Sequence, residues 1–329
     1  MKVLVTGSTG FIGVRLVHFL HKKGISVQIL CRKTSDIRTL KGLPIRIIHG
    51  DVLDYPSVEK AVDGCDSVFH LAGYAKNWAR RSKVFFDVNV GGTKNVLDAA
   101  KKAGVKKVVV TSTCMTFGPS AKAAKKECDE REASFFCAYE KAKSDCETLA
   151  CEYVDKGFQV VTVNPTRVFG PGLLNEANSV TKMIDKYIQG KWRFILSDGK
   201  AIGNYAYVED VVLGHWLALE KGKPGEKYIL GGENLTYNDF FKILSELSHR
   251  RYKIIHIPYK VAMAFAVFQN WMARWFHIYP LITPDWVRVF NSDWAFSSEK
   301  AEKEINYEIT PFREALDRTL SWLNREQGK

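Results

Sequence analysis

The first half of the chain alternates short runs of Val, Ile and Leu with longer stretches in which apolar residues recur at helical spacing. The short runs predict strands at residues 2–6, 26–31, 46–49, 67–71, 107–112 and 159–164. The stretches between them predict helices at residues 13–23, 57–62, 90–103 and 139–156. Strands this rich in aliphatic residues are covered on both faces, so the pattern predicts an α/β fold with a doubly wound parallel sheet.

This regularity fades after Pro165, where the pattern predicts a loop at residues 170–178 and helices at 179–189, 208–220 and 238–248. We expect residues 1–167 to form the first domain, to which the chain returns around residues 204–232. Residues 168–203 and 233–329 then form a smaller α+β domain. The sequence has no repeat, low-complexity tract or Pro-rich linker, so we expect the two domains to pack closely.

Composition excludes some classes of protein and leaves others open. A chain of 329 residues with 46% hydrophobic content is too apolar to be disordered. Lys and Arg exceed Asp and Glu by 48 to 36, which gives a formal net charge of +12 and calls for an anionic partner. Nucleic acid, an anionic membrane surface and a phosphorylated cofactor all fit that charge.

The cysteines and the apolar stretches indicate the compartment. Seven scattered cysteines without a C-x-x-C pair argue against a disulfide framework or a zinc site. The start of the chain lacks the apolar run of a signal peptide, and polar residues such as Gln269 and Asn270 interrupt the apolar stretch 261–282. We therefore expect a cytoplasmic protein with no metal site and no spanning helix.

The opening MKVLVTGSTGFIG is a predicted strand followed by three glycines and then a predicted helix. In a dinucleotide-binding turn the first glycine makes a tight turn, the second admits the diphosphate and the third packs the helix on the strand. The helix N-terminus then faces the anion. This context predicts a Rossmann fold and a cofactor site that contains Gly7, Thr9, Gly10, Phe11, Ile12 and Gly13.

The end of the second predicted strand indicates which nicotinamide cofactor binds. An acid there would accept hydrogen bonds from the ribose 2′-hydroxyl, but Arg32 and Lys33 follow instead, which favours NADP(H) over NAD(H). Asp51 and Val52 follow the third strand and are placed to reach the adenine. The small residues after the fourth strand let the backbone run close to the cofactor, at Leu71, Ala72 and Gly73.

Redox chemistry at a carbonyl requires a proton donor and a cation that lowers its pKa, which a Tyr and a Lys four residues later on one helix face can supply. The pattern occurs at Tyr139 with Lys143 and at Tyr187 with Lys191, where Gly190 interrupts the helix. We assign the first pair. Thr113, at the carboxyl end of the fifth strand, is the predicted second hydrogen-bond donor to the substrate oxygen.

These segments together resemble the extended short-chain dehydrogenase/reductases, or NAD(P)-dependent epimerase/dehydratase family, over nearly the whole chain. The resemblance rests on TGSTGFIG, GDVLD, HLAG, NVGGTKNVLDAA, TSTCMTFG, AYEKAKSDCE and NPTRVFGPG, which occur in family order. It implies that Thr113 and Tyr139 are catalytic and that Lys143 is the partner of Tyr139 and a ribose contact. It also implies that Asn89 supports the site and that Pro165 to Val168 cover the nicotinamide.

Local differences distinguish the branches of that family. Dehydratases resemble one another in an Asp-Glu pair after the catalytic Thr, whereas Cys114 and Met115 follow here. Sugar-nucleotide epimerases have a diphosphate-binding Arg where this chain has Gly203 and Asn204. Residues 203–240 instead resemble the dihydroflavonol-reductase-like branch and the hopanoid-associated sugar epimerases. This resemblance implies an NADP-dependent oxidoreductase acting on a carbonyl or secondary alcohol.

Two alternatives stay open: an epimerase that uses the same Thr, Tyr and Lys, and a dinucleotide-sensing scaffold that binds a polyanion. The substrate is expected to be a small, apolar molecule rather than nucleic acid, and the resemblance implies a homodimer formed through residues 90–103 and 139–156. Aromatic residues cluster late in the chain, where they can cover the substrate, contact a membrane or pack in the core. They are Phe265, Phe268, Trp271, Trp275, Phe276, Tyr279, Trp286, Phe290 and Trp294.

Overall fold

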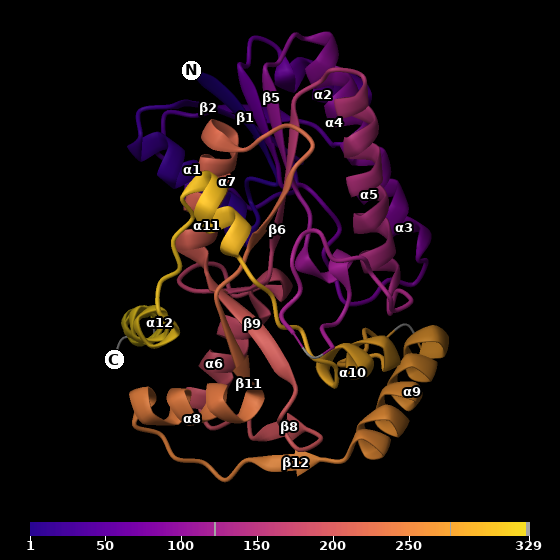
Figure 1. The fold of residues 1–329 in the computed structure, drawn as a ribbon, viewed down its shortest axis with the longest axis vertical. Coiled ribbons are helices and arrows are strands. Elements are labelled where there is room, and N and C mark those ends of the chain that lie inside the picture. Colours follow the sequence, from indigo (N-terminus) through magenta and orange to yellow (C-terminus); the bar gives the residue numbers. More distant parts are fainter. Residues whose placement is uncertain (122, 277, 327–329) are drawn as a thin grey trace.

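The computed structural model describes residues 1–121, 123–276 and 278–326 and forms two lobes (Figure 1). The upper lobe contains a seven-stranded sheet in which every pair of neighbours is parallel, in the order β10-β6-β5-β4-β1-β2-β3. The predicted doubly wound parallel sheet is therefore confirmed. Its strands are β1 (Lys2–Thr6), β2 (Ser26–Cys31), β3 (Arg46–His49), β4 (Ser67–His70), β5 (Lys107–Thr111), β6 (Val160–Pro165) and β10 (Lys227–Leu230).

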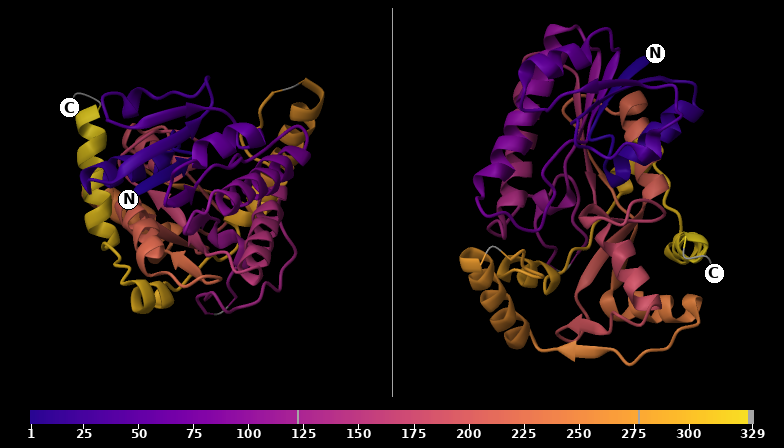
Figure 2. Two further views of the ribbon diagram at one scale, coloured as in Figure 1. Left: turned by 90° about the horizontal axis from the view of Figure 1, so that it is seen from above. Right: turned by 180° about the vertical axis from the view of Figure 1, so that it is seen from behind.

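Helices cover both faces of this sheet (Figures 1 and 2). One face carries α1 (Phe11–Lys22), α7 (Val208–Lys221) and α11 (Glu299–Ile305). The other carries α2 (Tyr55–Val62), α4 (Gly92–Lys102) and α5 (Ala138–Asp155), with the short α3 (Lys83–Phe86) beside α5. Alternate strand residues point into two separate apolar cores, so the strands need the unbroken aliphatic runs seen in the sequence.

The lower lobe is built on two small sheets. β9 (Ile202–Tyr207) lies between β7 (Arg167–Phe169) and β11 (Glu233–Thr236), and β8 (Phe194–Leu196) pairs with β12 (Ile255–Ile257). The helices around them are α6 (Ser179–Ile188), α8 (Tyr237–Ser248), α9 (Tyr259–Phe276) and α10 (Pro284–Phe290), and α12 (Phe312–Glu326) packs on α8. Between β9 and β11 the chain passes through α7 and β10 in the upper lobe. The domain boundaries given above stay predictions.

The predicted elements of the first half agree with the structure to within two residues, with one exception. The helix expected at residues 90–103 begins as a π-helical turn, Asp87–Gly91, which continues into α4. In the second half all three predicted helices exist, but the short strands β7 to β12 were not predicted. Strands of three to six residues that pair with distant segments leave little local periodicity.

The late aromatic residues do not form one group. Trp294 is 2% exposed in the core, Trp286 and Phe290 of α10 are half-buried, and Trp275 of α9 is 70% exposed. Among the described residues, no helix is both long and apolar enough to cross a bilayer.

Candidate active site

The glycine turn between β1 and α1 lies directly against the segment that follows β4. Gly7 has a φ of +68°, and a Cβ atom there would lie 2.5 Å from the carbonyl carbon of Leu71 and 2.6 Å from the nitrogen of Ala72. A Cβ on Gly13 would lie 2.1 Å from the Gly7 carbonyl oxygen. Both positions therefore require glycine, because any side chain would separate the helix, the turn and the neighbouring strand.

The N-terminus of α1 has the free hydrogen-bond donors that bind an anion. Gly10 is the N-cap residue and supplies no side chain to the free N–H groups of the first turn, which also contains no acid. The hydroxyl of Ser8 is buried without a hydrogen-bond partner. These donors fit the diphosphate of a dinucleotide. The side chain of Phe11 is buried in the core and that of Ile12 packs against it, so only their backbone can face the ligand.

Around this turn the other predicted cofactor residues follow the ends of β2, β3 and β4. Arg32 and Lys33 are exposed directly after β2 and form no ion pair with any described residue. Asp51 accepts a hydrogen bond from the backbone N–H of Leu53 at 3.0 Å. The carboxyl ends of parallel strands meet at one edge of a sheet, so these residues share that edge with the glycine turn.

Gly73 lies between the cofactor turn and the predicted catalytic residues. A Cβ atom on Gly73 would lie 2.7 Å from Oδ1 of Asn89 and 3.4 Å from Nζ of Lys143. The buried Asn89 belongs to the π-helical turn, and its Oδ1 accepts the backbone N–H of Tyr74 at 2.8 Å. Such turns often occur at functional sites because they redirect one side chain. Here the turn aims Asn89 at the backbone beside Lys143.

The three predicted catalytic residues come together at the end of β5. The side chain of Thr113 lies close enough to Tyr139 to influence the pKa of its phenol, and the Thr113 hydroxyl accepts the backbone N–H of Met115 at 3.3 Å. Lys143 lies one helical turn after Tyr139 on α5, and its Nζ donates to the carbonyl oxygen of Thr111 at 2.8 Å. The geometry is that of a proton donor with a second hydroxyl beside it.

The pKa values of this pair differ from the expectation. Burial raises the pKa of Tyr139 above its ordinary value, and the nearby thiols of Cys137 and Cys114 raise it further. Burial also lowers the pKa of Lys143. The expected lowering of the Tyr139 pKa is therefore wrong for the folded site, because removal of the phenol from water outweighs the stabilisation of its anion. At neutral pH Tyr139 is a protonated phenol.

The second Tyr and Lys pair has a structural role. Tyr187 is fully buried between α6 and α8, and its hydroxyl donates to the carbonyl oxygen of Arg250 at 3.0 Å. It lies in the lower lobe, away from the glycine turn. The assignment of Tyr139 and Lys143 rests on this difference in position as well as on the motif.

A buried carboxylate supports the catalytic strand and was not predicted from the sequence. Glu147 accepts hydrogen bonds at Oε1 from Ser112 at 2.5 Å, Thr116 at 2.9 Å and Asn164 at 2.7 Å, and its Oε2 pairs with Lys227 at 2.7 Å. The network fixes the ends of β5 and β6 to α5 and so positions Thr113 relative to Tyr139. The sequence signal was the spacing of Tyr139, Lys143 and Glu147 by four residues each.

Arg167 lies in the segment Pro165 to Val168, which the family resemblance places over the nicotinamide, but no separate role was predicted for its guanidinium group. The residue lies on β7 between Pro165, which ends β6, and the buried Val168. Its Nη1 donates to the hydroxyl of Tyr237 at 2.6 Å, whereas its Nη2 is buried without a partner. No described carboxylate forms an ion pair with it. The positive charge of this desolvated guanidinium faces phenols and aromatic rings and has no negative partner among the described residues, so an anionic ligand would stabilise it.

An apolar wall formed by the lower lobe stands behind Thr113. Cys114 and Phe117 pack in one cluster with Val289 of α10 and with Trp294, and Trp286 packs against it. Burial raises the pKa of the Cys137 thiol, and Asp285 at the start of α10 is close enough to raise it further. The site therefore has a polar half from the upper lobe and an apolar half from α10.

The chain matches the family described as "NAD dependent epimerase/dehydratase family" over residues 3–231. The chain belongs to this family. It is thus an NAD(P)-dependent enzyme of the dehydrogenase, epimerase and dehydratase type, as the motifs predicted. Both family membership and the glycine turn support use of an NAD(P) cofactor.

Relatives of similar length extend over the whole chain. "Sterol demethylase protein B" of Methylococcus capsulatus is 29% identical over 100% of this chain and 99% of its own. "Putative dihydroflavonol 4-reductase" of Synechocystis is 28% identical over 97% and 93%. Human "Sterol-4-alpha-carboxylate 3-dehydrogenase, decarboxylating" is 27% identical over 96% and 86%. The predicted resemblance to the dihydroflavonol-reductase-like branch is confirmed.

Solved structures agree on the fold. The UDP-glucose 4-epimerase of Thermus thermophilus, in complex with NAD, superposes with a TM-score of 0.81 at 22% identity and covers 98% of this chain and 99% of its own. At this identity the similarity shows the fold alone.

Proposed function

We propose that the chain is an NADP-dependent oxidoreductase that interconverts a carbonyl and a secondary alcohol on an apolar substrate. The observation that carries the proposal is the grouping of Thr113 and Tyr139 at the end of β5, beside Lys143. The cofactor, when bound, supplies or accepts the hydride. The residues that hold it are those of the glycine turn, the segment Leu71 to Gly73 and the exposed Arg32 and Lys33.

The protein's own residues handle the proton. During reduction the protonated phenol of Tyr139 donates its proton to the carbonyl oxygen and becomes a phenolate, and during oxidation the phenolate form of Tyr139 takes the proton from the alcohol. The hydroxyl of Thr113 holds the substrate oxygen beside the phenol. Lys143 places a positive charge one helical turn away, which stabilises the phenolate as it forms. Burial raises the pKa of Tyr139, so formation of its phenolate depends on the nearby positive charge of Lys143.

For the substrate we propose an apolar ring system that carries an anionic group. The apolar wall from α10 suits the rings, and the unpaired guanidinium of Arg167 suits a carboxylate. The names of two relatives refer to sterols, and one of these names refers to a sterol carboxylate. A 3-hydroxysteroid carboxylic acid and its methyl ester are therefore the matched probes.

A sugar-nucleotide epimerase is the second candidate, because it would use the same Thr, Tyr and Lys. At the position of its diphosphate-binding arginine, however, the Nδ2 of Asn204 already donates to the Gly232 carbonyl oxygen and to Oδ1 of Asn234, each at 2.8 Å. Asn204 is also almost fully buried. This argues for the oxidoreductase. A cytoplasmic location fits the seven free cysteines, because thiols persist in reducing compartments.

Replacement of Tyr139 tests the chemistry directly. We expect Tyr139→Phe to lower kcat on the steroid acid by about 10²- to 10⁴-fold with NADP⁺, since the proton-transfer group is lost. Cofactor binding, measured by fluorescence titration, should stay within about twofold. Tyr187→Phe is the matched control, since it removes the hydroxyl of the other Tyr and Lys pair. Full activity in Tyr139→Phe would refute the assignment, and equal rates with acid and ester would refute the anionic group.

Cofactor preference is a separate prediction. Removal of both cations in Arg32→Ala/Lys33→Ala should weaken NADP(H) at least about tenfold and leave NAD(H) within about twofold, because only NADP(H) carries the 2′-phosphate. Arg38→Ala is the control, since Arg38 is also exposed but is paired with Asp36 at 2.7 Å. Isothermal titration gives the four dissociation constants. Tighter binding of NAD(H) than NADP(H) to the unmodified enzyme would contradict the prediction.

A further inference from the structure

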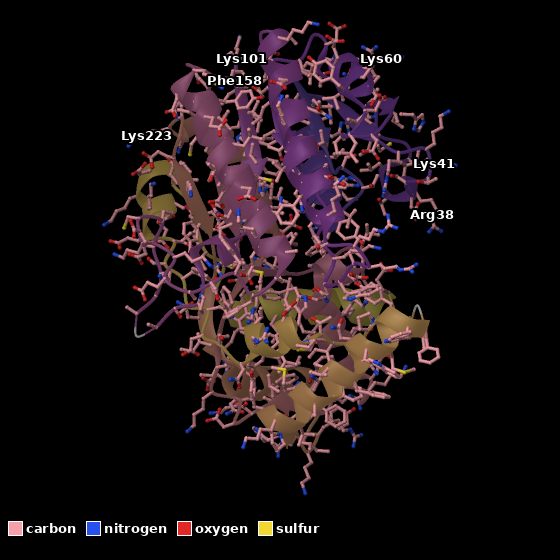
Figure 3. All side chains as sticks on the ribbon, turned by 90° about the vertical axis from the view of Figure 1, so that its right-hand side faces the viewer. Arg38, Lys41, Lys60, Lys101, Phe158 and Lys223 are labelled. Atoms are coloured by element: carbon pink, nitrogen blue, oxygen red, sulfur yellow. The ribbon has the colours of Figure 1, made fainter. Side chains whose placement is uncertain are left out.

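Helix α9 presents its large side chains to solvent and its small ones to the protein. Ala266 and Ala273, two turns apart, are its buried contacts. Its opposite face, which we call the α9 face, exposes large apolar side chains: Val261, Phe265, Phe268, Trp271, Trp275 and Phe276. A helix that stabilises a fold normally buries such residues, so this arrangement does not serve the folding of the chain alone. Figure 3 views this side and shows α9 at the lower surface with side chains pointing outward.

The apolar surface continues beyond the helix. Ile278 and Leu281, in the connection to α10, are exposed, and Leu281 is 78% exposed. Phe194 of β8 and Ile255 of β12, near the start of α9, are also exposed. A patch of this extent on a monomer marks an interaction site. Its aromatic content is typical of surfaces that lie at the boundary between lipid headgroups and acyl chains.

The charge around the patch has one sign. Residues 247–284 contain no Asp or Glu but include five cations, Arg250, Arg251, Lys253, Lys260 and Arg274. The side chain of Arg274 lies outside the described part of the structure, and Lys253 and Lys260 are exposed next to β12 and at the start of α9. A charge excess concentrated at an apolar surface favours an anionic partner.

A second group of cations adjoins the other end of the patch. The loop 74–82 contacts the α9–α10 region, since Trp78 stacks edge-on against Tyr279 and the Trp286 indole donates to the Asn77 carbonyl oxygen at 2.9 Å. Arg80 and Arg81 of this loop are exposed and form no ion pair with any described residue. Cations therefore flank the apolar face at both ends, which is the distribution that an anionic bilayer surface complements.

We propose that the α9 face is a membrane-docking surface that inserts into the headgroup region of an anionic bilayer. At about 1.5 Å per residue the 18 residues of α9 extend about 27 Å, and they would lie along the surface rather than cross it. A second copy of the chain is a poorer occupant, because self-pairing would bring the same cations face to face. Through α10 the docked surface leads to the apolar wall of the site, and this route for the substrate rests on the proposed function.

Vesicle binding tests the docking without reference to activity. At low salt the full chain should pellet with vesicles of phosphatidylcholine and phosphatidylglycerol and much less with phosphatidylcholine alone. Trp271→Glu/Trp275→Glu should weaken binding more than tenfold, because both side chains would carry charge into the interface. Arg80→Gln/Arg81→Gln should weaken binding to the anionic vesicles by about fivefold for each lost cation. Ile47→Glu, at an exposed apolar residue of β3, is the matched control.

Two further measurements separate membrane insertion from surface attraction and from misfolding of the variants. Trp fluorescence should be quenched by brominated phosphatidylcholine in the mixed vesicles, which reports insertion rather than surface attraction. Thermal melts and NADP(H) binding of each variant should match the unmodified chain. Absence of pelleting at low salt, or equal pelleting of the Trp271→Glu/Trp275→Glu variant, would overturn the proposal. If the unmodified chain does not bind vesicles and the Trp271→Glu/Trp275→Glu variant has a smaller oligomeric mass in solution than the unmodified chain, the α9 face is an interface between copies instead.

Discussion

The buried histidine His70 connects two of the strands that lead to the active site. The Ala72 N–H donates to the Thr6 hydroxyl at 3.2 Å, and this hydroxyl lies 2.8 Å from Nδ1 of His70. On the other side, Nε2 of His70 lies 3.0 Å from the hydroxyl of Thr93, which donates to Cys146. A neutral imidazole with its proton on Nε2 satisfies every one of these contacts. Burial lowers the pKa of His70 to about 3.

This residue makes the stability of the fold depend on pH. In the unfolded chain a histidine binds a proton below about pH 6.5, whereas His70 in the folded protein does so only near pH 3. Protons therefore favour the unfolded state between these values, and stability present above pH 6.5 is lost as pH falls. Urea titrations at several pH values between 4.5 and 6 give the free energy of unfolding as a function of pH. We expect this free energy to change less steeply with pH in His70→Asn than in the unmodified protein, by about 1.4 kcal/mol per pH unit. An unchanged slope would contradict the lowered pKa.

At the residue scale, local motifs revealed some site residues and missed others. Tyr139 and Lys143 could be predicted because their spacing on one helix is itself the signal. The roles of Glu147 and Arg167 were not predicted, because their partners lie far along the chain and the four-residue spacing of Glu147 from Lys143 was the one local signal. Glu147 meets Lys227, and Arg167 meets Tyr237. The pKa of Tyr139 was misjudged for a related reason, since burial is a property of the folded site and not of the motif.

At the scale of elements, the contact between α1 and the glycine turn is the most demanding in the cofactor site. We expect Gly13→Ala to weaken NADP(H) binding more than tenfold and to lower Tm, because the added methyl group would displace α1 from the Gly7 carbonyl. Gly91→Ala is the matched control, since a Cβ there would meet only Leu53 at an ordinary 3.8 Å. Titration and thermal melts measure both effects. Equal NADP(H) affinities of the Gly13→Ala and Gly91→Ala variants would contradict this prediction and show that α1 can shift without weakening cofactor binding.

The elements that could be predicted are those whose burial leaves a periodic pattern. Strands β1, β2, β4, β5 and β6 lie inside the sheet and read as aliphatic runs, and the edge strand β3 contains two isoleucines, so the positions of all six were accurate. Helix α9 was not predicted, because its outward face is as apolar as a core face and the polar positions that define an amphipathic helix are few. The π-helical turn before α4 was also missed, since its signature is a change in hydrogen bonding and not in hydrophobicity.

At the scale of the whole molecule, the homodimer is the expectation still to be tested. The predicted interface consists of α4 and α5, which cover the same face of the seven-stranded sheet and expose a stripe that includes Thr148 and Glu152. Helix α9 belongs to the other lobe (Figure 1), so such a dimer leaves the α9 face free to meet a membrane. Dimerisation and membrane docking therefore use different surfaces and can be tested separately.

Light scattering during gel filtration measures the mass of the protein in solution and so tests for the dimer. We expect twice the chain mass of 37.3 kDa for the unmodified protein and a monomer for Thr148→Arg, because two-fold symmetry places each new charge near its counterpart. Asp317→Arg, at an exposed position of α12, introduces an arginine away from that face with an even larger change of charge, and this variant should stay dimeric. A dimer that survives Thr148→Arg but dissociates in Trp271→Glu/Trp275→Glu would move the interface from α5 to α9.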